Sequence, residues 1–261
     1  MNIEKLDLLK SAIDFLISEG FSNLYPPQAD CIKAGLLDGQ SILVSAPTAS
    51  GKTLTATLAI INYLSKNKGK VIYLSPLRAL ASEKYIEFKK LEKVELGKKI
   101  KVGISTGDFE NIEKNLEKNN VLILTNEKMD SIIRHGAEWI DEIGLVIVDE
   151  IHLIGDETRG PTLEMVLTKL KLLVSKPQIV GLSATITNSD EIARWLNCTL
   201  VKNDWRPVPL SEGVYDDGKV LMSDGKKFNI EPSLCGIPVD LGVQSVKEGG
   251  QSLVFAETRT R

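Results

Sequence analysis

The sequence has little cysteine and no long apolar run, and both shortages narrow the classes of protein that it can belong to. Three cysteines occur among 261 residues, and Cys31, Cys198 and Cys235 lie too far apart to form a metal-ligand spacing. We therefore expect free thiols in a reducing, cytoplasmic compartment. No apolar run approaches the roughly 18 residues that a membrane-spanning helix requires, so we expect no membrane partner.

A secretory signal and a net positive charge are also missing. Residues 2–19 predict an amphipathic helix instead of a signal, because apolar residues recur at helical spacing from Ile3 to Leu16. The formal net charge of −3 gives no support for nucleic-acid binding. It does not exclude such binding, because a basic channel can lie on an acidic protein.

Short apolar strands alternate with helical segments along the first 200 residues. Strands are predicted at 41–45, 71–75, 100–104, 121–124, 145–148 and 179–182. Helices are predicted at 26–37, 52–65, 77–93, 109–120, 126–134, 161–174 and 189–197. The alternation predicts an α/β fold with a parallel sheet covered by helices on both faces. Right-handed crossovers would then place the carboxyl end of every strand along one edge, where the loops line a common crevice.

A glycine-containing loop follows the first strand and begins a helix. Residues 46–53 read A-P-T-A-S-G-K-T and fit the phosphate-loop pattern, except that Ala46 replaces the first glycine. Backbone N–H groups of such a loop point at phosphate oxygens. We expect Lys52 to contact the β- and γ-phosphates of a nucleotide, and the Thr53 hydroxyl to bind Mg²⁺. The alternative is a plain strand–turn–helix connection.

Two adjacent carboxylates end the apolar strand at 145–148. Asp149 is expected to hold Mg²⁺, and Glu150 to orient and deprotonate an attacking water. The alternative is a pair of acids that caps a helix. Together with the phosphate loop, the acid pair predicts a nucleotide-hydrolysis site.

The sequence pattern changes after about residue 200. Residues 205–209 form a proline-stiffened connector, and Asp-Gly pairs at 217–218 and 224–225 are hairpin-turn signals. A further strand is expected at 252–257. We interpret 1–200 as one nucleotide-binding domain, and 201–261 as a connector followed by the opening of a second, incomplete α/β domain.

Several segments resemble motifs of the superfamily-2 DExH helicases. Residues 46–53, 149–152 and 181–185 resemble motifs I, II and III. Residues 24–28, 75–80, 125–128 and 252–255 resemble the adenine-reading Q motif and motifs Ia, Ib and IV. Residues 105–108, 159–164 and 205–207 are similar to the superkiller (Ski) branch, and most similar to its archaeal Hjm type of fork-repair helicase.

The resemblance implies a RecA-like, ATP- and Mg²⁺-dependent motor that moves 3′ to 5′ on single-stranded or forked DNA as a monomer. The catalytic residues would be Lys52, Asp149 and Glu150. The nucleotide would be held by Gln28, Ala46, Thr48, Ala49, Ser50, Gly51, Lys52 and Thr53. The sugar-phosphate backbone of the nucleic acid would be contacted by Arg78, Thr106, Gly107 and Thr125. Ser183 and Thr185 would bridge to His152 and so couple the hydrolysis site to the surface that binds nucleic acid.

Relatives in this family complete the γ-phosphate site with arginines from motifs V and VI, which no segment here matches. Such an arginine typically raises the rate of nucleotide hydrolysis by about 10³–10⁵-fold. We therefore expect the 261-residue chain by itself to bind nucleotide weakly and to turn it over poorly.

Three alternatives remain open. An RNA helicase of the same branch would use the same backbone contacts, which do not distinguish the sugar. A nucleotide-gated clamp would bind strands without unwinding them, although it has no need of the water-activating Glu150. A phosphate-loop kinase would not explain the segments that resemble motifs III and IV.

Overall fold

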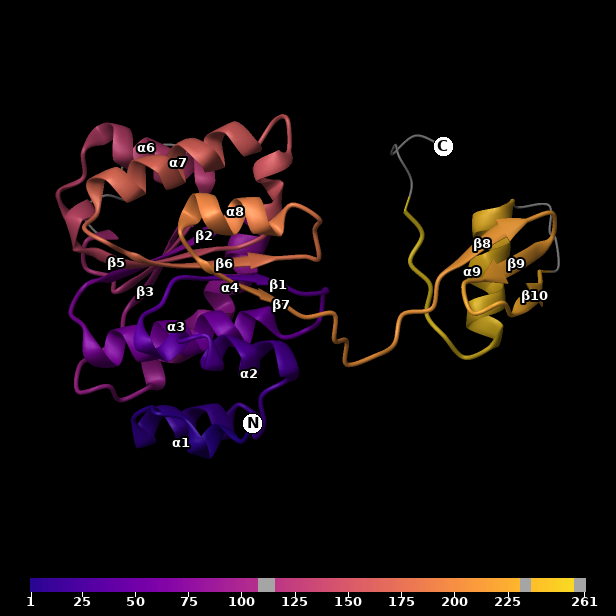
Figure 1. Cartoon of the computed structure of the whole chain (residues 1–261), viewed down its shortest axis with the longest axis horizontal. Helices are drawn as coiled ribbons and strands as arrows, with labels where there is room; N and C mark the ends of the chain where they lie inside the picture. Colours follow the sequence, from indigo (N-terminus) through magenta and orange to yellow (C-terminus); the bar gives the residue numbers. More distant parts are fainter. Residues whose placement is uncertain (108–115, 231–235, 256–261) are drawn as a thin grey trace. The chain divides into compact units, whose positions relative to one another are not determined.

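Seven strands of the described residues form one parallel sheet, which confirms the predicted α/β class. The computed structural model describes residues 1–107, 116–230 and 236–255. The chain divides into two units, Met1–Pro207 and Val208–Arg261, and the sheet lies in the first (Figure 1). The strand order is β3 (Val102–Ser105), β4 (Val121–Thr125), β2 (Lys70–Ser75), β5 (Ile143–Val148), β6 (Gln178–Ser183), β1 (Ile42–Ser45) and β7 (Thr199–Lys202).

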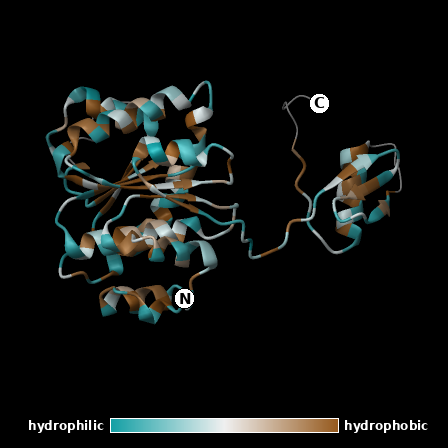
Figure 2. Cartoon of the chain, in the orientation of Figure 1, coloured by the Kyte–Doolittle hydropathy of each residue, from teal (hydrophilic) through white to brown (hydrophobic). Residues whose placement is uncertain are grey.

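Helices cover both faces of this sheet. One face carries α1 (Lys10–Ser18), α2 (Pro26–Lys33), α3 (Lys52–Lys66) and α4 (Arg78–Lys89). The other carries α6 (Asn126–His135), α7 (Gly160–Leu173) and α8 (Ser189–Leu196). Successive strand residues point to opposite faces, so Ile42 and Val44 enter the first core and Leu43 enters the second. Strands β1, β2 and β5 are buried on both faces, and the sheet appears as the apolar centre of Figure 2.

The predicted N-terminal helix is wrong in its first half. The structure has a short 3-10 helix, η1 (Ile3–Lys5), and α1 begins only at Lys10. The first residues pair with a later segment, because Ile3 N donates to Ser22 O and Leu24 N donates to Met1 O. These extended contacts replace the first turns that the apolar spacing predicts.

Other predicted boundaries also differ from the structure. The helix predicted at 26–37 ends at Lys33, because Gly35 has φ 91° and a 3-10 helix, η2 (Leu36–Asp38), follows it. The helix predicted at 77–93 ends at Lys89 and tightens into η3 (Lys90–Lys93). Sequence reasoning missed the edge strand β7. Much of the helix predicted at 109–120 falls on residues outside those that the structure describes.

The second unit contains a small antiparallel sheet, β8 (Gly213–Asp216), β9 (Lys219–Met222) and β10 (Lys227–Asn229), with α9 (Ile237–Lys247). Its turns confirm both hairpin signals, since Asp217 and Gly218 have φ 39° and 77° and Gly225 has φ 85°. The strand predicted at 252–257 is wrong where the structure describes it, because residues 252–255 are exposed and form no strand. Across the described ranges, the structure contains no helix with the length and apolarity needed to cross a bilayer.

We expect Gly160→Ala to destabilise the first unit. An added Cβ would lie 2.3 Å from the carbonyl oxygen of Ile154, a backbone atom in the 3-10 helix η5 (Ile151–Gly155), so the start of α7 would have to move. The free energy of unfolding should fall by about 1–3 kcal/mol. Urea unfolding followed by tryptophan fluorescence measures this, because all three tryptophans lie within Met1–Pro207.

Gly155→Ala is the matched control, since its added Cβ would meet no atom within 4 Å. Its stability should stay within about 0.5 kcal/mol of the unchanged protein. Equal losses in the two variants would show that the contact with Ile154 does not matter.

Candidate nucleotide and nucleic-acid sites

The predicted site residues lie along one edge of the sheet. Residues 46–51 follow β1, and Asp149 follows β5, at the carboxyl ends of parallel strands. Both carboxylates of the acid pair act electrostatically on Lys52. The predicted common crevice therefore brings the phosphate loop and the acid pair together.

The phosphate loop has an unusual backbone and an unpaired hydroxyl. Ala49 has φ 65° and Gly51 has φ 84°, and a left-handed alanine is strained. Ser50 Oγ is buried without a hydrogen-bond partner, whereas Thr48 and Ala49 are exposed. Ala46 is fully buried, so its methyl group fills space inside the fold at the position where the pattern has glycine. A strained loop with an unsatisfied donor aimed inward is suited to bind an anion.

The Lys52 ammonium folds back over this loop. Its Nζ donates to the carbonyl oxygens of Ala46 at 2.9 Å and Pro47 at 3.2 Å. Burial lowers the pKa of Lys52, and Glu150 and Asp149 counteract that shift. A desolvated lysine facing two carboxylates is a strong electrostatic contact for a phosphate group.

Asp149 is held on both oxygens. Tyr73 Oη, from β2, donates to Oδ2 at 2.7 Å, and the Glu150 N–H donates to Oδ1 at 3.0 Å. Burial, and then the charge of Asp149, raises the pKa of Tyr73 well above its usual range. Sequence reasoning missed Tyr73, although a tyrosine in a strand buried on both faces needs a partner for its hydroxyl.

Glu150 is the second strained residue of the site, with φ 47°. Its Oε2 lies 3.3 Å from His152 Nδ1, which makes an ion pair only if the imidazole is protonated. The predicted bridge from His152 to Ser183 and Thr185 is not formed among the described residues: Ser183 Oγ donates to Ala184 O at 2.8 Å, and Thr185 is exposed. Ser183 instead joins the phosphate loop, because its carbonyl accepts from Ala46 N at 3.2 Å.

Gln28 connects the start of α2 to the phosphate loop. Its Oε1 accepts from Tyr25 N at 2.7 Å, and its Nε2 donates to Gly51 O at 2.9 Å. Gly51 has φ 84°, a backbone conformation that strains any residue with a Cβ, so this position favours glycine. A Cβ there would also displace the Gln28 amide, because it would lie 2.1 Å from Nε2. The bonds to Tyr25 and Gly51 use one of the two lone pairs on Oε1 and one of the two N–H groups on Nε2, so the Gln28 amide has one further acceptor and one further donor position.

A cavity of about 420 Å³ lies beside Gln28. Its lining includes Phe21, Asn23, Tyr25, Thr53 and Glu87. The Trp205 ring lies 4.5 Å from that of Tyr25, so it packs against an aromatic side chain that lines the cavity. The cavity has the size and mixed lining of a small-ligand site.

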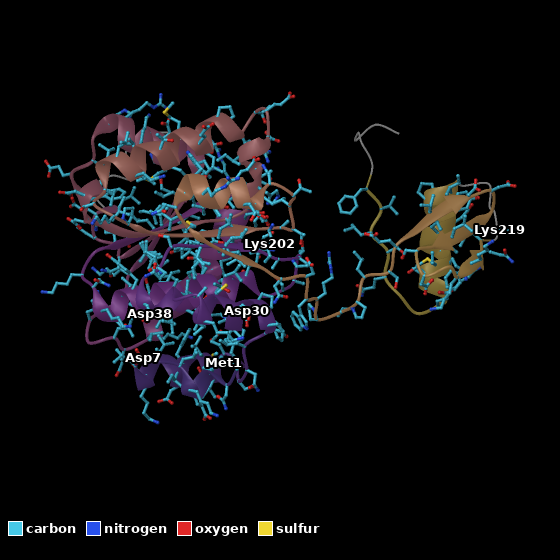
Figure 3. The ribbon with its side chains drawn as sticks, in the orientation of Figure 1. Met1, Asp7, Asp30, Asp38, Lys202 and Lys219 are labelled. Carbon is cyan, nitrogen blue, oxygen red and sulfur yellow. The ribbon has the colours of Figure 1, made fainter. Side chains whose placement is uncertain are left out.

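The segment after β7 packs against α2 beside this cavity. Asn203 Nδ2 donates to Asp30 Oδ2 at 2.9 Å, and its Oδ1 accepts from Trp205 N. Lys33 and then Asn203 hold the pKa of Asp30 below its usual range. Figure 3 labels Asp30 on α2 and Lys202 at the end of β7.

A second cavity, of about 560 Å³, gathers the four predicted strand-contacting residues, Arg78, Thr106, Gly107 and Thr125. Lys128 and Arg159 line this cavity as well, and the sequence alone did not assign either of them a contact with nucleic acid. Thr125 Oγ1 accepts from Lys128 N at 3.3 Å and thereby caps α6. Cationic side chains and a helix N-terminus in one hollow suit a phosphate backbone.

The ligands expected for Mg²⁺ are few. Among the described residues, no group of three or more His, Cys, Asp or Glu side chains could hold a metal. Mg²⁺ commonly takes one or two protein ligands and completes its shell with phosphate and water. Thr53 and Asp149 therefore fit a metal that arrives with a nucleotide.

The DEAD/DEAH box helicase model matches residues 25–192, a range that contains the acid pair, all of the second cavity and part of the cavity beside Gln28. The chain belongs to the DEAD/DEAH box helicase family. This membership confirms the superfamily to which the motifs pointed, and the parallel sheet is the RecA-like domain of a helicase.

Curated relatives include two proteins named ATP-dependent DNA helicase Hel308, the Hjm type. The one from Pyrococcus horikoshii is 45% identical over 263 residues, and the one from Caldivirga maquilingensis is 48% identical over 263 residues. The alignments cover 100% and 99% of this chain, and 35% and 34% of the relatives. The chain thus spans about a third of their length.

Solved helicase structures share the fold. Mycobacterium smegmatis Lhr bound to ssDNA and AMP-PNP superposes with a TM-score of 0.66 at 31% identity, covering 78% of this chain and 28% of Lhr. The DUF1998 helicase MrfA bound to DNA has a TM-score of 0.64 at 22% identity, covering 76% and 30% of the two chains. At that identity, MrfA supports the fold alone.

We expect Tyr73→Phe to raise the Mg²⁺ concentration that nucleotide binding requires. The change removes the 2.7 Å hydrogen bond to Asp149 and leaves the ring in the core. Hydrogen bonds to charged groups contribute about 1.5–3 kcal/mol, so half-maximal binding should require about tenfold more Mg²⁺. Titration of Mg²⁺ into protein with a fluorescent ATP analogue measures this shift.

Tyr85→Phe is the control, because Tyr85 lies on α4 with its ring near Lys89. An unchanged titration for Tyr73→Phe would mean that Asp149 is positioned without its tyrosine partner.

Proposed function

We propose that this chain is part of an ATP-dependent helicase motor that moves 3′ to 5′ along single-stranded DNA during fork repair. The observation that carries the proposal is the acid pair at the end of β5, where Tyr73 fixes Asp149 and Glu150 is strained beside Lys52. Strain at a conformationally restricted acid is typical of functional sites.

In this proposal, ATP and Mg²⁺ occupy the edge formed by the phosphate loop and the acid pair. Lys52 and the loop N–H groups, with Ser50 Oγ, hold the phosphates, while Thr53 and Asp149 hold Mg²⁺. The metal would supply charge neutralisation at the phosphates. Glu150 orients the attacking water and takes its proton. Gln28 and the cavity beside it receive the base.

The nucleic-acid strand is assigned to the second cavity. Arg78, Thr106, Gly107 and Thr125 contact its backbone, and Lys128 and Arg159 add charge. Support for DNA comes from the names of the Hel308 relatives and from the ssDNA in the Lhr complex. Backbone contacts carry no sequence information, so binding should be independent of sequence.

The remaining assignments follow from the same family. His152, Ser183 and Thr185 are proposed to couple hydrolysis to the strand, with the bridge forming during the cycle. Residues 201–261 are proposed as the connector and the opening of a second RecA-like domain, and the motor is proposed to act as a monomer.

ATP turnover of the full-length protein, with single-stranded DNA and then single-stranded RNA at one fixed salt concentration, tests the function. We expect DNA to stimulate turnover and RNA to have little effect. Salt must be fixed because backbone binding weakens steeply as salt rises. Equal or greater stimulation by RNA would favour an RNA helicase, and no stimulation by either would remove the motor assignment.

Glu150→Gln should lower ATP turnover by about 10²–10⁴-fold while ATP binding is retained, because only the general base is lost. Glu157→Gln, at an exposed position in the same segment, is the control. Steady-state turnover and the affinity for a fluorescent ATP analogue separate the two effects. Normal turnover by Glu150→Gln would assign the base elsewhere.

A further inference from the structure

Helix α4 contributes residues to both cavities. Arg78, the first residue of α4, lines the second cavity, which is proposed to hold the nucleic-acid strand. Glu87, near the end of α4, lines the cavity beside Gln28, which is proposed to hold the nucleotide base. Between them, Lys84 Nζ donates to Thr53 Oγ1 at 2.9 Å. From Arg78 to Lys84 the helix rises about 9 Å at 1.5 Å per residue. One short helix therefore spans the distance between the two sites.

The position of Lys84 is closely determined. Its side chain is 12% exposed, and its Nζ also donates to Glu87 Oε2 at 3.0 Å and lies 3.8 Å from Glu83 Oε1. Glu87 stands one helical turn away on the same helix, so it limits the rotamers of Lys84. A mostly buried lysine needs such partners, and here one partner is a hydroxyl of the nucleotide site.

The contact affects what the Thr53 hydroxyl can do. A threonine hydroxyl has one proton to donate and two lone pairs that accept. Lys84 uses one lone pair, which orients the other lone pair and the proton. The same hydroxyl is the proposed Mg²⁺ ligand, so a lysine on α4 sets the orientation of a metal ligand on α3.

We propose that Lys84 is a positioning residue, and that α4 couples strand binding to nucleotide binding through it. This inference rests on the proposed function. A nucleic-acid strand that binds at Arg78 moves α4, a continuous helix of 12 residues. That movement shifts the contact between Lys84 and Thr53. Coupling is reciprocal: if the nucleic-acid strand changes the affinity for nucleotide, nucleotide changes the affinity for the nucleic-acid strand by the same factor.

The test measures binding in the full-length protein. The dissociation constant of a fluorescent, non-hydrolysable ATP analogue with Mg²⁺ is determined with and without saturating oligo(dT). Coupling between two sites typically changes affinity by about 5–150-fold. In Lys84→Met, oligo(dT) should change the nucleotide dissociation constant by about twofold or less. Lys84→Arg, which keeps a cationic donor, should retain most of the change seen in the unaltered protein.

Lys89→Met is the matched control, because Lys89 ends the same helix and pairs with Glu92. It should keep the change found in the unaltered protein. Lys84→Gln, which is polar but too short to reach Thr53, replaces Lys84→Met if the latter does not fold. A merely structural lysine would lower the melting temperature and leave the strand-induced change intact, and that result would overturn the proposal.

The two hypotheses fail in different ways. If the unaltered protein binds neither nucleotide nor strand, the proposed function is refuted. If it binds both but neither ligand alters the affinity for the other, the function stands and the role of α4 is refuted.

Discussion

Parallel pairing of short, doubly buried strands is the constraint on which the site depends. β1 and β5 each pair with β6, so the residues that follow β1 and β5 are delivered to the same edge of the sheet. Pairing continues past the strand ends, because Ala46 N donates to Ser183 O and Asp149 N donates to Leu74 O. The phosphate loop and the acid pair are therefore fixed by backbone hydrogen bonds before any side chain contributes.

That rigidity makes the strained residues tolerable. Ala49 and Glu150 both have positive φ, each at a cost of about 1–3 kcal/mol. Ala49 and Glu150 stand four and two residues beyond the ends of β1 and β5, strands buried on two faces whose apolar contacts offset the strain. The strain in turn presents the loop and the carboxylate of Glu150 in conformations that an unconstrained chain would rarely adopt.

Local pattern was enough to predict the strands, the phosphate loop and the acid pair, because each combines a short apolar run with a distinctive polar end. It could not predict contacts between distant segments. The pairing of Ile3 with Ser22 shortens the N-terminal helix, and Tyr73 reaches Asp149 from another strand. Lys84 shows the same limit, since in sequence it is one more charged residue on a helix with a polar face.

The phosphate loop and the start of α3 are joined to two neighbouring helices by single side-chain hydrogen bonds. Gln28 on α2 donates to Gly51 O, and Lys84 on α4 donates to Thr53 Oγ1. A net hydrogen bond contributes about 0.5–1.5 kcal/mol, and a coupling free energy is typically about 1–3 kcal/mol. Exchanging one or two such bonds is therefore sufficient to link a change at the nucleotide to a change elsewhere. The sheet stays fixed while these side-chain bonds are exchanged, so a rigid fold is compatible with a coupled motor.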